Sequence, residues 1–229
     1  MQTSTIRAAT TTSQQPLHIV FCHGLESGPN GYKVRMMREK GATVTAADMS
    51  MSLFNPLRSN SVVRKLLSPQ VLFSWPSRWI QAALASSFWS CVEVQRGVII
   101  NRECKEDGKF DVLIGSSWGG AVACALLAEG TWSGPALLMC PALNKLGQRS
   151  GSGNISGAIV QGLNAMSESQ KSRCLLIHGD ADDTVPLEDS MKLAEETGIK
   201  LEVIEGGTHG MSALARDGRL LKFAERVVL

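Results

Sequence analysis

The segment GSSWG, residues 115–119, has the spacing G-x-S-x-G with Ser117 at its centre. It follows an apolar run and precedes a stretch of small and apolar residues, so we expect it on the turn between a strand and a helix. A serine on such a sharp turn raises its hydroxyl above the sheet, and the helix beyond it aims N–H groups at a developing oxyanion. The spacing therefore indicates Ser117 as a candidate nucleophile and gives Ser116 no chemistry.

A serine hydroxyl is a weak nucleophile unless a base takes its proton, and the chain has four histidines. His209 stands in EGGTHGM, a glycine-rich loop after the last expected strand, from which an imidazole can reach over the edge of the sheet. His18 lies inside an expected strand and is interpreted as structural, while His23 and His178 each end a strand in His-Gly. His209 is therefore the favoured general base.

A carboxylate must fix the tautomer of that histidine and stabilise its charged form. The loop HGDADDTVP, residues 178–186, supplies Asp180, Asp182 and Asp183. The chain order is then Ser, Asp, His, on three loops that follow strands of one sheet. Because parallel strands end at the same edge, these loops are expected to converge.

These residues together resemble the α/β-hydrolase superfamily of serine hydrolases, over nearly the whole chain from residue 17 onward. In that superfamily the acid is the first residue of D-x-x-V-P, which is Asp182 here, with Val185 and Pro186 completing the pattern. Asp183 is the fallback, and Asp180 is interpreted as a turn or capping residue. The stretch HGLESGP, residues 23–29, is similar to small, compact members of esterase or thioesterase character.

The resemblance also implies an oxyanion hole made of two backbone N–H groups. In the superfamily the residue after the first His-Gly supplies one of them, which is Leu25 here, and Trp118, just after the candidate nucleophile, supplies the other. For the substrate pocket we name His23, Trp75 and Trp79 as candidates. No cofactor is implied, and no metal, because the histidines lack ligand spacing.

Short apolar runs that alternate with helical patterns must position these residues. We expect strands over 17–24, 43–49, 110–117, 135–142, 174–180 and 199–207. We expect helices over 31–40, 118–130, 186–197 and 211–229, the last interrupted near Gly218. Strands alternating with helices predict an α/β fold, with a mostly parallel sheet of about six strands and helices on both faces. This is a three-layer α/β/α arrangement and a reduced α/β-hydrolase fold.

Two connections are too long for a plain crossover. Residues 50–109 are expected to hold more than one helix, the last over 91–105, and their aromatic residues at 73–89 could form a lid and acyl pocket, ordinary core packing or a subunit contact. The second connection, 143–173, contains GQRSGSGNISG (147–157), which is expected to be a flexible surface loop. We expect a disordered tail over 1–15 and one domain over 16–229, with 50–90 as a lid or insertion.

Composition narrows the class of protein. The 229 residues are 44% hydrophobic and 19% charged with a net charge of +2, which permits a large core and argues against a nucleic-acid partner. No apolar run is long enough to span a membrane. The six cysteines form no C-x-x-C pair, which favours a reducing compartment and a cytoplasmic location.

The expected activity follows from the resemblance. It implies a serine esterase, a carboxylic ester hydrolase that works through an acyl-enzyme on small-molecule or acyl esters, with short acyl chains favoured by the small size of the chain. One alternative is an acyl-protein thioesterase (depalmitoylase) or lipase that acts on longer chains. A second alternative is a non-catalytic binding protein on the same fold. A homo-oligomer stays open.

Overall fold

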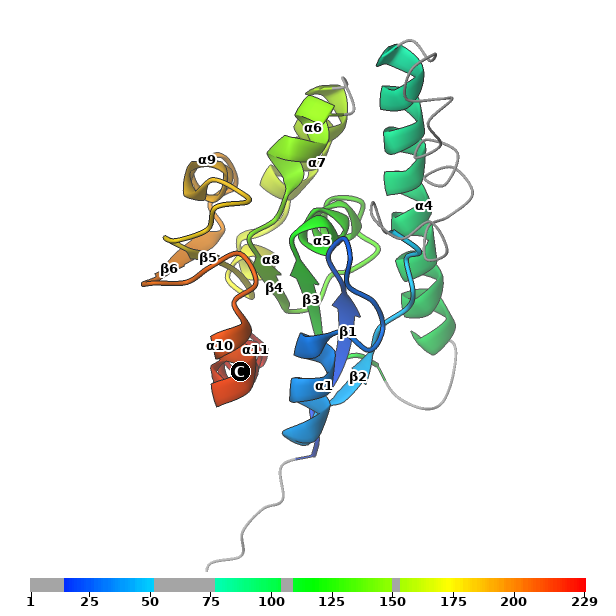
Figure 1. The fold of residues 1–229 in the computed structure, drawn as a ribbon. Helices are drawn as coiled ribbons and strands as arrows, with labels where there is room; N and C mark the ends of the chain where they lie inside the picture. Colours follow the sequence, from blue (N-terminus) through cyan, green and yellow to red (C-terminus); the bar gives the residue numbers. More distant parts are fainter. Residues whose placement is uncertain (1–14, 52–76, 104–108, 150–152) are drawn as a thin grey trace, which may run out of the picture.

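A computed structural model describes residues 15–51, 77–103, 109–149 and 153–229 (Figure 1). Its six strands form one sheet in the order β2-β1-β3-β4-β5-β6, and every neighbouring pair is parallel. The strands are β1 (His18–Cys22), β2 (Thr43–Thr45), β3 (Val112–Ser116), β4 (Ala136–Met139), β5 (Cys174–Gly179) and β6 (Lys200–Ile204). The expected parallel sheet of about six strands is confirmed.

Helices cover both faces of this sheet. One face packs against α1 (Tyr32–Glu39), α10 (Ser212–Asp217) and α11 (Arg219–Val228). The other face packs against α4 (Ser77–Glu103), α5 (Trp118–Ala128), α6 (Leu143–Arg149), α7 (Gly153–Asn164) and α9 (Leu187–Thr197), and the short α8 (Glu168–Lys171) precedes β5. Figure 1 shows α4 as the longest helix, standing at the right of the sheet. The three-layer prediction is confirmed.

Burial along the strands explains why their sequences read as continuous apolar runs. Every residue of β3, β4 and β5 is buried, as expected for inner strands that have helices on both faces. The edge strand β6 instead exposes Lys200 and Val203. Helix α5 is buried on nearly all sides, because it lies against the sheet and is covered by α4 and α7.

The direction in which the chain adds strands to the sheet reverses between β1 and β3. From β1 the chain crosses to β2 on one side, and it later enters β3 on the other side of β1. The loops that follow two such neighbouring strands diverge and leave a crevice at their carboxyl ends, where open α/β sheets bind ligands. The candidate nucleophile follows β3 and the candidate oxyanion residue Leu25 follows β1, so both come from this point.

The expectation of a flexible loop over 147–157 is wrong. Helices α6 and α7 occupy most of that stretch, and Leu146 and Ile159 are buried in the core beside α5. The glycine, serine and asparagine content indicated a loop, but the apolar residues at helical spacing determine the structure. Strand β2 is also shorter than expected and ends at Thr45.

The described part of the long 50–109 connection is one helix, α4, which begins well before the expected 91–105. Phe88 is fully buried against the core, whereas Trp89, its neighbour, is 36% exposed. Trp75 and most of the expected lid lie outside the described residues, as do residues 1–14 of the expected tail. Across the described ranges, no helix combines the length and apolar character needed to cross a membrane.

Candidate active site

Ser117 occupies a strained turn between β3 and α5. Its φ of 57° and ψ of −117° are unusual for a residue with a side chain, and such conformations cost about 1–3 kcal/mol. Its N–H donates to the Met139 carbonyl at 2.9 Å, and its own carbonyl accepts from the Ala142 N–H at 3.0 Å. Contacts to the end of β4 therefore hold the backbone in a conformation that it would not adopt alone.

A close approach of two backbones places this turn beside the loop after β1. A Cβ atom on Gly119, in the first turn of α5, would lie only 2.0 Å from the carbonyl oxygen of Cys22. Only glycine permits this contact. A Cβ on Gly24 would lie at an ordinary contact distance, 3.4 Å, from the Cβ of Ser117, so the loop after β1 runs beside the serine.

His209 joins the serine to a carboxylate. Its Nε2 lies 2.9 Å from the Ser117 Oγ, and its Nδ1 lies 2.7 Å from the Asp182 Oδ2. Because a carboxylate can only accept, the Nδ1 carries the hydrogen and the Nε2 is free to accept the serine proton. This is the tautomer that a general base requires.

Asp182 is a fully buried carboxylate with three hydrogen bonds. Its Oδ1 accepts from the N–H groups of Thr184 and Val185, both at 2.8 Å, while its Oδ2 faces His209. Burial alone would raise the pKa of Asp182, but the Val185 N–H, the His209 ring and the Thr184 N–H together hold it below its ordinary value. The carboxylate is therefore kept ionised beside His209.

The other two aspartates of this loop form hydrogen bonds with groups other than His209. Asp183 is exposed and accepts from the Thr184 hydroxyl at 3.0 Å. Asp180 accepts from the Gly206 N–H at 2.7 Å and so ties the loop after β5 to the loop after β6. The geometry brings Asp182, the first residue of D-x-x-V-P, to His209.

The buried residue His178 was not anticipated as part of the site. Its Nδ1 lies 2.6 Å from the Ser190 Oγ, and its Nε2 lies 3.0 Å from the Val185 carbonyl and 3.3 Å from the Asp182 Oδ2. A carbonyl can only accept, so the Nε2 carries the hydrogen and the Nδ1 accepts from the Ser190 hydroxyl. The imidazole thus connects α9 to the loop that carries Asp182.

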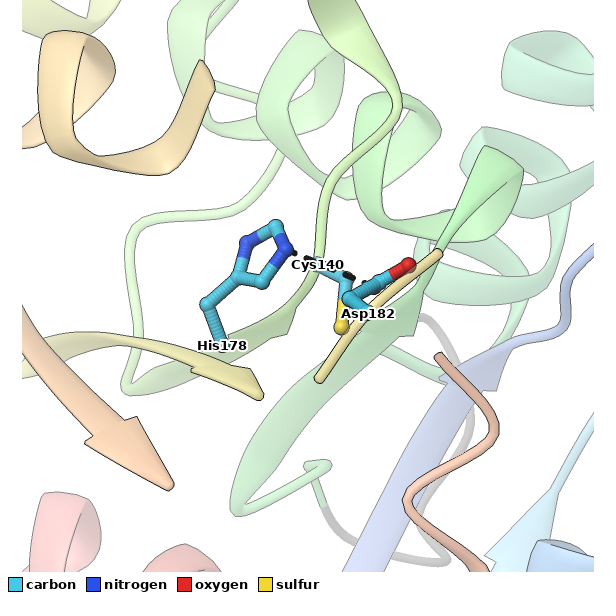
Figure 2. Close-up of side chains that lie close together, drawn as sticks. All are labelled: Cys140, His178 and Asp182. Carbon is cyan, nitrogen blue, oxygen red and sulfur yellow. Dashed lines mark ion pairs between the residues drawn. The ribbon is translucent and has the colours of Figure 1, made fainter. Parts of the chain in front are cut away.

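Figure 2 shows Cys140, His178 and Asp182, whose potential ligand atoms all lie within 4.8 Å of one another. By residue type this group could hold a metal ion. In the structure described, burial first and then the Asp182 carboxylate raise the pKa of Cys140 to about 12, so this thiol is neutral. A metal would also need a lone pair on the His178 nitrogen that carries the hydrogen. The group is better described as the hydrogen-bonded support of Asp182.

A cavity of about 200 Å³ opens at Ser117 and His209. Its remaining walls come mainly from β1, the loop after it and α1: Phe21, Gly24, Leu25, Ser27, Gly31, Lys33, Val34, Ser116 and Gly210. A larger cavity of about 480 Å³ lies between α7 and α9 and includes neither Ser117 nor His209. Sequence reasoning anticipated Leu25 here but missed Phe21 and Lys33.

The candidate His23 does not line this cavity, which corrects our expectation. His23 is fully buried, its Nδ1 donates to the Gly24 carbonyl at 2.9 Å, and its Nε2 accepts from the Met49 N–H at 3.2 Å. His23 therefore ties the loop after β1 to the segment around Met49. Trp75 and the side chain of Trp79 lie outside the described residues.

The two candidate oxyanion donors come from different loops: Trp118 follows Ser117 in the chain, and Leu25 follows β1. Trp118 is the first residue of α5, where an N–H has no acceptor within its helix. Leu25 lies in the wall of the cavity. Within the described ranges, neither N–H donates to a protein acceptor.

Solved structures share this fold at low sequence identity. Est1E from Butyrivibrio proteoclasticus with bound ferulic acid is 13% identical, with a TM-score of 0.56 over 93% of this chain and 92% of its own. TT1662 from Thermus thermophilus is 18% identical, with a TM-score of 0.54 over 94% and 90%. An alpha-beta serine hydrolase homologue from Coxiella burnetii is 14% identical, with a TM-score of 0.53 over 93% and 83%. At such identities these likenesses show the fold alone.

The sequence itself gives the more specific comparison. Among curated proteins, none matches this chain. The model of a family described as "Serine hydrolase (FSH1)" matches residues 78–211, which is more than half of the chain and includes Ser117, Asp182 and His209. The chain is therefore an α/β-hydrolase that belongs to the FSH1 family of serine hydrolases.

Proposed function

We propose that this hydrolase cleaves carboxylic esters through a covalent acyl-enzyme on Ser117. The observation that carries the proposal is the unbroken hydrogen-bond chain from Ser117 through His209 to Asp182, with distances of 2.9 and 2.7 Å. A nucleophile and base within hydrogen-bond reach, with the base oriented by a third group, are the geometric signature of nucleophilic catalysis.

In the first half of the reaction, the Ser117 oxygen forms a bond to the ester carbonyl carbon and His209 takes the serine proton. The carbonyl π electrons move onto oxygen, and the Leu25 and Trp118 N–H groups stabilise that oxyanion. When the carbonyl re-forms, the bond to the alkoxy group breaks and His209 gives its proton to the departing alcohol. Asp182 stabilises the imidazolium while it exists.

In the second half, water attacks the acyl-enzyme. His209 accepts a proton from the water as its oxygen bonds to the acyl carbon, and then returns that proton to Ser117 when the acyl–serine bond breaks. The net reaction adds one water and releases one acid and one alcohol. This scheme uses side chains, backbone N–H groups and water, and it calls for no metal or cofactor.

The size of the cavity supports short acyl groups. Its volume of about 200 Å³ is below the 300–1,000 Å³ that is typical of small-molecule sites. Hydrolysis of a thioester would use the same residues, so an acyl-protein thioesterase or lipase stays the alternative if residues 50–90 enlarge the site. A non-catalytic binding protein is disfavoured by the hydrogen-bonded triad and by the strained turn at Ser117.

Labelling with a fluorophosphonate probe tests the nucleophile. We expect the wild-type protein to label and Ser117→Ala not to label. Ser133→Ala, which changes an exposed serine outside the cavity, should label normally. Equal labelling of wild type and Ser117→Ala would overturn the assignment. A series of p-nitrophenyl esters from acetate to palmitate then tests chain length: turnover that rises steadily with length would favour the lipase or thioesterase alternative.

A further inference from the structure

Lys33, the second residue of α1, lies in the wall of the same cavity as Ser117 and His209. The ester hydrolysis proposed above uses no lysine. Phe21 and Val34 supply apolar surface beside it, so one small cavity presents the candidate nucleophile, an apolar wall and a cation.

The charge of Lys33 has no counterion in the described part of the chain. No hydrogen bond or ion pair with an acidic residue involves its ammonium there, although the side chain is partly buried. Burial lowers the pKa of Lys33 below its ordinary value. The Cys140 thiol acts in the opposite direction and raises the pKa of Lys33 by a smaller amount. With a pKa of about 12, that thiol is neutral and does not balance the charge. A partly desolvated cation without a counterion favours binding of an anion.

The start of α1 adds to the positive character of this wall. Gly31 is the N-cap of the helix and provides no side-chain hydrogen bond to the first-turn N–H groups. The first turn holds no acidic residue. The dipole of the helix favours negative charge at such an end.

We propose that the physiological substrate is a short acyl ester whose acyl part carries a second, anionic group, and that Lys33 binds this group. A carboxylate and a phosphoryl group share the required chemistry. The proposal rests on the esterase function argued above. The reaction then converts an anionic half-ester and water into a dianion, an alcohol and a released proton, so the chain would act after a reaction that esterifies one end of a short diacid.

Matched esters test the proposal on the purified full chain. The probes are the monomethyl and dimethyl esters of succinate, glutarate and adipate, which differ in charge but keep the same scissile bond, with methanol release followed by NMR. We expect at least one monoester to exceed its diester in kcat/KM by about tenfold or more, the effect of one charge-assisted hydrogen bond. Methyl 4-phosphonobutanoate distinguishes the two anions, since the better substrate identifies the preferred group.

Variants on α1 test whether Lys33 is the cause. In Lys33→Met the ratio of monoester to diester kcat/KM should fall to about one, whereas Lys33→Arg should keep part of the preference. Lys40→Met, at the exposed C-terminal end of the same helix, is the matched control and should keep the wild-type ratio. Fluorophosphonate labelling of each variant checks that the site has folded.

The outcomes separate this proposal from the proposed function. If the wild type hydrolyses monoesters no better than diesters, or if Lys33→Met keeps the preference, the role of Lys33 is overturned and the esterase function stands. If neither hydrolysis nor labelling occurs, the esterase function fails. In that case, NMR titration of Ser117→Ala with monomethyl glutarate tests the role of Lys33 in binding. The role is overturned if this variant does not bind the ester, or if adding Lys33→Met leaves the binding unchanged.

Discussion

The imidazole of His178 lies 3.3 Å from the carboxylate of Asp182, and both side chains are completely buried. The histidine also donates to the Val185 carbonyl and accepts from Ser190, so it fixes the loop that presents the carboxylate to His209. A residue that acts through another in this way is a positioning residue, and its loss should alter catalysis as well as stability.

Replacing His178 with Phe should lower kcat by about 10- to 100-fold, which is the usual effect of losing a supporting residue behind a functional group. It should also lower the free energy of unfolding by about 1–3 kcal/mol, because the Val185 carbonyl and the Ser190 hydroxyl lose a buried partner. Ester kinetics and urea unfolding measure the two effects. Ser190→Ala removes only one of these bonds and should give a smaller loss of both; an unchanged kcat in His178→Phe would leave the histidine a purely structural role.

The lowered pKa of Asp182 gives a pH dependence of stability with a defined sign. A carboxylate whose pKa is lower in the folded than in the unfolded state contributes stability above its ordinary value, near 4. This contribution is lost as the pH falls through the folded-state pKa. Asp182→Asn should therefore be less stable than wild type at pH 7, with a difference that shrinks below pH 4 in urea unfolding. A difference that stays constant from pH 7 to 3 would show that ionisation of Asp182 contributes no stability.

The same Asp182→Asn variant should lose about 10³- to 10⁴-fold in kcat, because an amide favours the wrong tautomer of His209. The kinetics of ester hydrolysis at pH 7 measure this loss. Asp183→Asn is the matched control, since Asp183 is exposed and contacts Thr184 rather than the histidine. If both variants lost activity equally, the choice of acid would be wrong.

Gly119 should be intolerant of a side chain. In Gly119→Ala the new Cβ would overlap the Cys22 carbonyl, 2.0 Å away, so the first turn of α5 must move and displace Ser117. We expect a loss of about 1–3 kcal/mol in unfolding free energy and slower fluorophosphonate labelling. Gly157→Ala, in α7 with nothing near the added atom, should instead stabilise by about 0.5–1 kcal/mol. Chemical denaturation of the two variants provides the comparison.

The described cysteines should resist modification in the folded protein. All five are free and buried, and burial raises the pKa of each: Cys22, Cys91, Cys124, Cys140 and Cys174. Thiolates react and neutral thiols do not, so peptide mapping after treatment with Ellman's reagent should find them unmodified until urea unfolds the chain. Rapid modification of Cys140 in the native protein would contradict its burial beside His209.

Much of this candidate site could be predicted because each candidate residue follows an expected strand and stands in a recognisable motif. Ser117, Asp182 and His209 stand in G-x-S-x-G, D-x-x-V-P and a glycine-rich loop, and the parallel sheet brings these loops together.

Long-range packing could not be predicted in the same way. His178 ends a strand in the motif His-Gly exactly as His23 does in the sequence, yet one supports the acid loop and the other supports the loop after β1. The place of Lys33 in the cavity could not be predicted, because it depends on how α1 packs on β2 and α10. Helices α6 and α7 were not predicted, because this stretch contains many glycines and serines and only a few apolar residues. Those few apolar residues pack the two helices against the core.

The strand order has a consequence for folding, because the candidate base follows the edge strand of the sheet. Ser117 and His209 are separated by 92 residues, and His209 stands on the loop that follows β6, which pairs with β5 at the edge of the sheet. A chain released before its last strand would carry the nucleophile without its base. Covalent labelling of Ser117 would therefore report completion of the sheet, and it could time the last step of folding.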